Sequence, residues 1–146
     1  MTAGLKLLAQ DADDLKVISA YVQDAIVRVG DLAYLPRQHR FAAYINRYCW
    51  EDCGDGKAGA RMCSGLHFDG VLKAQTQRIR QDDPESLLEL LALDFTPEGE
   101  VGGVIDLLFA GGGSIRLTVE CIDGVLRDMG GPWPAKVRPE HGIETG

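Results

Sequence analysis

The segment VIDLLFAGGGSIRLTV, residues 104–119, decides the predicted fold. Two apolar runs, Val104 to Phe109 and Ser114 to Val119, flank Ala110-Gly111-Gly112-Gly113. Glycine readily adopts the positive φ angles of a tight turn between antiparallel strands, so the segment predicts a β-hairpin. It does not fit a phosphate-binding loop, because it lacks the Lys-Ser/Thr pair and a following helix.

Residues 40–50, RFAAYINRYCW, predict a long strand, because aromatic and β-branched side chains favour extended backbone. The period of two predicts one face with Phe41, Ala43, Ile45, Arg47 and Cys49, and another with Ala42, Tyr44, Asn46, Tyr48 and Trp50. Further strand patterns cover residues 5–9, 27–29, 66–79 and 87–95. The stretch 87–95 also has the length of a short helix, but the turn signal after it favours a strand.

Two helices are predicted, one towards each end of the chain. Residues 12–24 carry apolar side chains at helical spacing, and Asp11 before them is a good N-cap. After Glu120, the side chains that fall on one helical stripe are Cys121, Ile122, Val125, Leu126 and Met129. Gly130-Gly131-Pro132 would end this second helix.

These elements predict an α+β fold with a mostly antiparallel sheet, because short connections join the strands. We expect a strongly bent sheet or partial barrel of about six or seven strands with an N-terminal and a C-terminal helix, pleckstrin-homology-like as first choice. Residues 1–131 are expected to form a single domain, and residues 132–146 an extended tail rich in Pro and Gly.

Composition narrows the class of protein. The 146 residues include 15 Lys and Arg against 22 Asp and Glu, a net charge of −7. Binding to nucleic acid or to an anionic membrane needs a positive surface, so neither partner is expected. The sequence shows no secretory-signal pattern and no apolar run long enough to span a membrane, which predicts a cytoplasmic protein with reduced thiols.

A possible metal site has the pattern Cys49-x3-Cys53-x9-Cys63-x3-His67. Three thiols and an imidazole are ligands that tetrahedral zinc accepts. The alternative is that these cysteines lie near one loop by chance, with Cys49 packed as a small apolar residue. The spacing matches no familiar zinc module, so no cofactor is predicted.

A possible catalytic pair is His67 and Asp69, which would point the same way from one strand. A histidine held by a carboxylate can act as a general base. No nucleophile motif accompanies the pair, and Asp69-Gly70 also fits a bend, so structural roles on a solvated strand are favoured.

A possible partner surface comprises Tyr44, Tyr48 and Trp50, with Arg47 beside them. Packing of the aromatic side chains in the core beneath the first helix explains them as well or better.

Four stretches, residues 15–25, 31–36, 65–69 and 109–122, resemble an alphaproteobacterial family of small cytoplasmic proteins classed as a domain of unknown function. The resemblance covers nearly the whole chain and implies no activity, substrate or catalytic residue. It implies that Cys53 and Cys63 lie in a loop that varies within the family, which weakens the zinc hypothesis.

The residues therefore favour a non-enzymatic interaction or regulatory domain that binds an unidentified protein or a second copy of itself. A small-ligand or enzymatic pocket near His67 and Asp69 is the alternative, and a zinc-stabilised protein is the third.

Overall fold

The structure is a computed structural model that describes residues 4–48 and 61–130. This part of the chain holds one α-helix, nine β-strands and two short 3₁₀ turns. In chain order the elements are β1 (Lys6–Ala9), α1 (Ala12–Val22), β2 (Ile26–Leu35), η1 (Pro36–Gln38), β3 (Arg40–Tyr48), β4 (Arg61–Asp69), β5 (Val71–Gln77), β6 (Leu87–Pro97), β7 (Gly103–Phe109), η2 (Ala110–Gly112), β8 (Ser114–Val119) and β9 (Gly124–Gly130). The predictions for Cys49, Trp50, Cys53 and the tail 132–146 lie outside the described residues.

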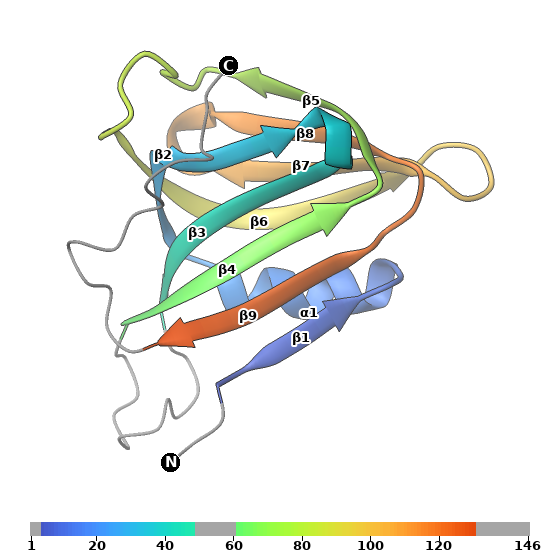
Figure 1. Cartoon of the computed structure of the whole chain (residues 1–146), viewed down its shortest axis with the longest axis horizontal. Helices are drawn as coiled ribbons and strands as arrows, with labels where there is room; N and C mark the ends of the chain where they lie inside the picture. The colour runs from blue at the N-terminus through green and yellow to red at the C-terminus, as the bar shows by residue number, and fades with distance from the viewer. Residues whose placement is uncertain (1–3, 49–60, 131–146) are drawn as a thin grey trace.

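All nine strands form one open antiparallel sheet, in the order β1-β9-β4-β3-β2-β6-β7-β8-β5. The antiparallel arrangement predicted from the short connections is confirmed. Gly70, with φ of +72°, lies between β4 and β5, and the chain then pairs with β8 at the far edge of the sheet. Figure 1 shows β3, β4, β9 and β1 in front and β6, β7 and β8 behind them.

The predicted hairpin is β7 and β8. Its register pairs Leu108 with Ser114 and Asp106 with Arg116. Gly111 and Gly112 in the connection have φ angles of 88° and 96°, the conformation for which glycine was expected.

The predicted N-terminal helix is confirmed as α1. The Asp14 amide donates to Oδ1 of the N-cap Asp11 over 2.8 Å. Leu15, Ile18 and Val22 are buried on the face that packs towards the sheet. Figure 1 shows α1 behind the front strands, and its main contacts are with β6 and β1.

One hydrophobic core lies between α1 and the two halves of the sheet. The strands contribute inward side chains at alternate positions, as the period of two requires. Its largest fully buried apolar members are Leu15, Ile18, Ile45, Leu66, Phe68, Leu90, Ile105, Leu107, Ile115, Leu117 and Leu126. The side chains of β3, β4 and β9 that point away from this core are therefore free to form an outer surface.

The predicted C-terminal helix is wrong, since the residues assigned to it form the turn before β9 and β9 itself. Leu126 is fully buried, whereas Met129 is 55% exposed. Over so short a stretch, the spacing of the apolar residues fits both the helical period of about 3.6 residues and the strand period of two. Pairing with β4 on one side and β1 on the other decides in favour of a strand, because tertiary contacts override local helical preference.

The predicted partial barrel of about six or seven strands, pleckstrin-homology-like and closed by a second helix, is also wrong. The observed sheet is open and has nine strands in the described part of the chain, where α1 is the one α-helix, so the fold is mostly β and the predicted α+β class is wrong as well. The expectation missed the β1–β9 edge, and it joined β4 and β5 into one strand although Gly70 separates them. No helix within residues 4–48 and 61–130 is long and apolar enough to cross a membrane.

Candidate functional site

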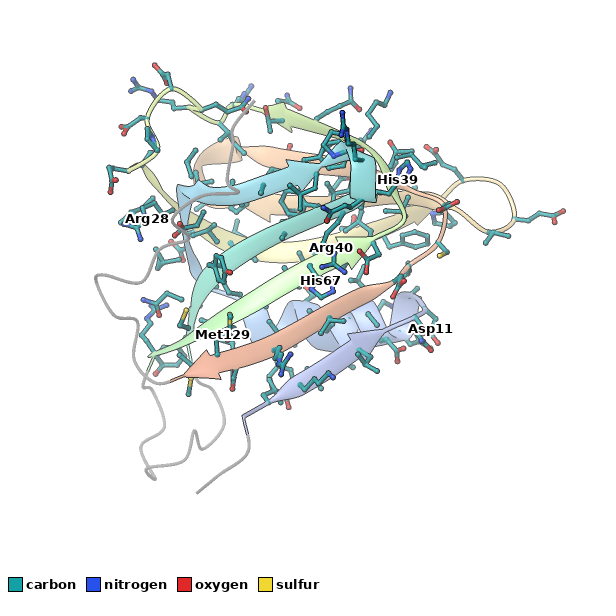
Figure 2. The ribbon with its side chains drawn as sticks, viewed as in Figure 1. Asp11, Arg28, His39, Arg40, His67 and Met129 are labelled. Atoms are coloured by element: carbon teal, nitrogen blue, oxygen red, sulfur yellow. The ribbon has the colours of Figure 1, made fainter. Side chains whose placement is uncertain are left out.

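The outward side chains of β1, β9, β4, β3 and β2 form one surface on the side of the sheet opposite the core. Register places one outward residue of each strand in a row across the sheet. One row is Lys6, Arg127, Gly65 and Tyr44, and the next is Leu8, Val125, His67, Ala42 and Ala33. Figure 2 shows Arg40, His67 and Met129 on the viewer-facing side of these strands.

A depression of about 490 Å³ hollows this surface, and we call it the outer groove. It is lined by Lys6, Leu8, Asp31, Ala33, Leu35, Arg40, Ala42, Ala43, Tyr44, Gly65, Leu66, His67, Val125, Arg127 and Met129. Five strands contribute to it, so its shape depends on the pairing of the sheet and not on any single loop.

Small residues shape the floor of the outer groove, and large apolar residues form its rim. A Cβ added to Gly65 would lie 3.2 Å from Sδ of Met129, so the absence of a side chain lets the thioether lie over the strand. Leu8 and Met129 are 56% and 55% exposed on the rim. Leu8 and Met129 therefore lie on either side of the row that holds Lys6 and Arg127. Exposed apolar side chains next to charged ones are common at binding surfaces.

Two cations border the groove without a partner in the described part of the chain. Lys6 and Arg127 are directly opposite each other on β1 and β9, and both are exposed. No carboxylate of residues 4–48 or 61–130 forms an ion pair with either. The one acidic residue that lines the groove, Asp31, accepts a hydrogen bond from Arg28 over 3.2 Å. The groove therefore has positive character in a protein of net charge −7.

Arg40 and Asp69 form an ion pair at one end of the groove. The Arg40 Nε donates to Asp69 Oδ1 over 2.7 Å, and Nη2 donates to Oδ2 over 3.2 Å. These hydrogen bonds lower the pKa of the Asp69 carboxyl and raise the pKa of the Arg40 guanidinium. Both oxygens of Asp69 are thus already engaged by a permanent cation.

The structure brings His67 and Asp69 to one face, as their spacing predicted, but not into a catalytic hydrogen bond. His67 Nε2 lies 3.8 Å from Asp69 Oδ2, beyond hydrogen-bond distance. Burial lowers the pKa of His67, and the nearby Arg40 charge lowers it further. Within the described residues, therefore, His67 and Asp69 lack the hydrogen bond through which a carboxylate orients a general base.

The geometry of β4 bears on the metal hypothesis. Cys63 and His67 project from the same face of β4, four residues apart, a separation of about 13 Å along a strand. Zinc ligands lie within about 2.3 Å of one ion, so these two cannot share it in this strand. Burial raises the pKa of the Cys63 thiol, which disfavours the thiolate that a metal needs. Cys63 also lies in a strand and not in a loop, while Cys49 and Cys53 are outside the described residues.

The predicted partner surface is divided between two faces. Tyr44 lines the outer groove. Tyr48 lies further along β3, where its ring is 5.5 Å from Cζ of Arg61. Arg47 points the opposite way, is fully buried, and donates to both carboxylate oxygens of Asp128 over 3.0 and 2.9 Å. Of the four proposed residues, therefore, only Tyr44 lies beside His67 in the groove, and Trp50 is outside the described residues.

A match to a known protein family covers nearly the whole chain. A family model described as "Protein of unknown function (DUF2948)" matches residues 5–141. The chain belongs to this family. The match includes every residue that lines the outer groove, from Lys6 to Met129. Neither the curated proteins nor the solved structures yielded a match.

Sequence reasoning missed the groove residues of this DUF2948 member that lie on β1 and β9. The sequence predicts a helix for the segment that holds Arg127 and Met129, and it predicts a strand or an extended lead-in for residues 5–9, which hold Lys6 and Leu8. The alternation of Lys6, Leu8 and of Val125, Arg127, Met129 was the available signal, since period two puts each set on one face. Only the β1–β9 pairing joins the two sets.

Proposed function

We propose that this DUF2948 protein is a non-enzymatic interaction module and that the outer groove is its contact surface for another protein. The observation that carries the proposal is the combination of exposed Leu8 and Met129 with Lys6 and Arg127, which form no ion pair within residues 4–48 and 61–130, around a floor of small residues. Interface centres are commonly built from apolar anchors with Met, Tyr and Arg, and polar groups at the rim.

The lining of the groove supports a contact surface. Five strands contribute exposed apolar and cationic side chains to it, and His67 and Asp69 beside it do not hydrogen-bond to each other. The pocket alternative near His67 and Asp69 has weaker support, because Arg40 occupies both oxygens of the carboxylate. The cytoplasmic location and alphaproteobacterial source remain predictions from the sequence.

Site-specific photocrosslinking in cells tests the proposal. A photoreactive amino acid replaces Leu8 or Met129 in the groove, and Val101 or Leu87 elsewhere serves as control, since these are 70% and 65% exposed. We expect discrete crosslinks to a second protein from the groove positions alone. The crosslinked band is then identified by mass spectrometry.

A matched pair of double variants completes the test. L8S/M129S should lose the crosslinked protein on co-purification, whereas L87S/V101S should retain it, because both pairs remove similar exposed apolar area. Equal crosslinking at groove and control positions, or none at the groove, would contradict the proposed contact surface.

A further inference from the structure

The outer groove ends at β1, the first strand in the order of the sheet. β1 has four residues and pairs with β9 on one side. No strand from residues 4–48 or 61–130 pairs with its other side. An edge strand presents unpaired N–H and C=O groups to which another extended chain can hydrogen-bond. Figure 1 shows β1 as the outermost strand of the front layer.

The two cations beside this edge favour a negatively charged group on a partner. Lys6 and Arg127 are directly opposite on neighbouring strands, where side chains are about 5 Å apart at Cβ and like charges repel. A carboxylate placed next to Lys6 on an added strand would meet one cation directly and the other across β1. Relief of this repulsion adds to the attraction, so an acidic side chain is favoured at that position.

The next outward residue of β1 favours a different kind of side chain on the added strand. Leu8 is 56% exposed and lies opposite Val125 in the row next to Lys6. An apolar residue that faces Leu8 from an added strand would cover the exposed side chain of Leu8 and remove that surface from water. The two outward positions of β1 thus specify one acidic and one apolar neighbour, two residues apart.

We propose that the partner protein contributes an extended segment that pairs antiparallel with β1 and carries an apolar residue, any residue and then Asp or Glu. The order follows from direction, because an antiparallel segment passes Leu8 before Lys6. Every pair in this sheet is antiparallel, and antiparallel pairing is slightly more stable per residue than parallel pairing. This inference rests on the proposed function and names the chemistry of its partner.

A second copy of the chain is a poorer occupant of the same edge. Two-fold pairing of β1 with itself, with both outer faces on one side, would bring a second Lys6 and a second Arg127 to the cluster. Four cations would then share one surface, which increases repulsion.

Selection from a random seven-residue peptide phage library on the immobilised full-length protein tests the inference. We expect enrichment of the apolar-x-Asp/Glu pattern. A selected peptide should bind K6E about tenfold or more weakly, since the charge beside its carboxylate is reversed. K73E is the matched control, because Lys73 is exposed on β5, the strand at the other edge of the sheet. It should bind like the wild type.

A backbone test separates strand addition from side-chain docking alone. N-methylation of the peptide amide that faces β1 should abolish binding, while methylation of the neighbouring amide should not. Selection without the pattern, equal binding to K6E and K73E, or indifference to N-methylation would overturn the inference. Groove-specific photocrosslinks at Met129 alongside such a result would leave the contact surface standing and reject only the acidic segment.

Discussion

Two arginine–aspartate pairs lie on opposite faces of the sheet, each with its arginine on β3, and they differ chiefly in burial. Arg40 and Asp69, on the outer face of β3 and β4, have side chains 41% and 32% exposed. Arg47 and Asp128, on the inner face of β3 and β9, are 0% and 6% exposed. Both pairs are held by two hydrogen bonds from the guanidinium.

The inner pair is embedded in further polar contacts that the outer pair lacks. Asp128 also accepts from Ser64 Oγ over 2.7 Å and from the Leu5 amide over 3.1 Å. The Asp128 carboxylate thereby links β3, β4, β9 and the residue that precedes β1. The comparison teaches that one chemistry serves two purposes: the buried pair fixes the strands that carry the groove, and the outer pair shapes the groove's charge.

Removal of the buried guanidinium should have the largest effect. R47A leaves the Asp128 carboxylate buried without its cation, and we expect a loss of about 3–5 kcal/mol in the free energy of unfolding. Urea denaturation followed by circular dichroism measures it. R40A should cost about 0–1 kcal/mol, because water replaces the lost partner of an exposed pair. Equal losses would contradict the division between the two faces.

Two glycines, one packed against the core and one on the floor of the groove, allow the two faces of the sheet to be compared by packing. A Cβ on Gly124 would lie 2.6 Å from Cε1 of Phe68 in the core, whereas one on Gly65 would meet the flexible end of Met129 at 3.2 Å. We expect G124A to cost about 1–3 kcal/mol and G65A less than about 1 kcal/mol. Thermal unfolding of both variants decides the matter. A G65A protein as destabilised as G124A would show that the floor of the groove is rigid.

Acidification should affect the two arginine–aspartate pairs differently, because protonation of each carboxylate is coupled to unfolding. Burial alone would raise the pKa of the Asp128 carboxyl, but hydrogen bonds from Arg47, Ser64 and the Leu5 amide, with the Arg47 charge, hold it below its usual value. A lowered folded-state pKa gives stability that is present above the unfolded value of about 3.9 and lost as pH falls through the folded value.

The expected result is a fall in the free energy of unfolding below about pH 4. D128N should be less stable than the wild type at neutral pH and should lose less on acidification. D69N is the control and should follow the wild-type slope more closely, since its carboxylate is more exposed. Parallel slopes for D128N and the wild type would refute the assignment.

The smallest expected effect is on His67. Burial first, and then the Arg40 charge, lower the pKa of its imidazole. R40Q removes that charge and leaves Asp69 without its guanidinium, so the His67 pKa should rise. NMR titration of the imidazole protons measures it, with assignment from an H67N variant. An unchanged or lower pKa in R40Q would mean that Arg40 does not act on this side of the groove.

Much of the local structure could be predicted because its causes are local. The N-cap at Asp11, the glycine turn of the 104–119 hairpin and the alternation along β3 each depend on neighbouring residues. The face assignments for β3 were right for residues 41–48, including the placement of Arg47 with Phe41 and Ile45. That placement already implied that Arg47 faces the core, although we had grouped it with a partner surface.

The candidate site could be predicted only in part. His67 and Tyr44 were singled out, and both line the outer groove. Lys6 and Arg127 are 121 residues apart in the chain, and no local pattern brings them together. Their importance depends on strand order, which arises from long-range pairing.

By itself the sequence determined an acidic, strand-rich chain with one capped helix and a hairpin with a glycine-rich turn. Backbone preference, helix capping and the period of apolar residues each act over a few neighbouring residues. Tertiary structure alone decided that residues 124–130 are a strand and that Asp128 meets Arg47. It also decided that five strands share one groove. Hydrogen-bond partners and buried neighbours come from distant segments, and these contacts outweigh the weak local preferences that leave helix and strand nearly balanced.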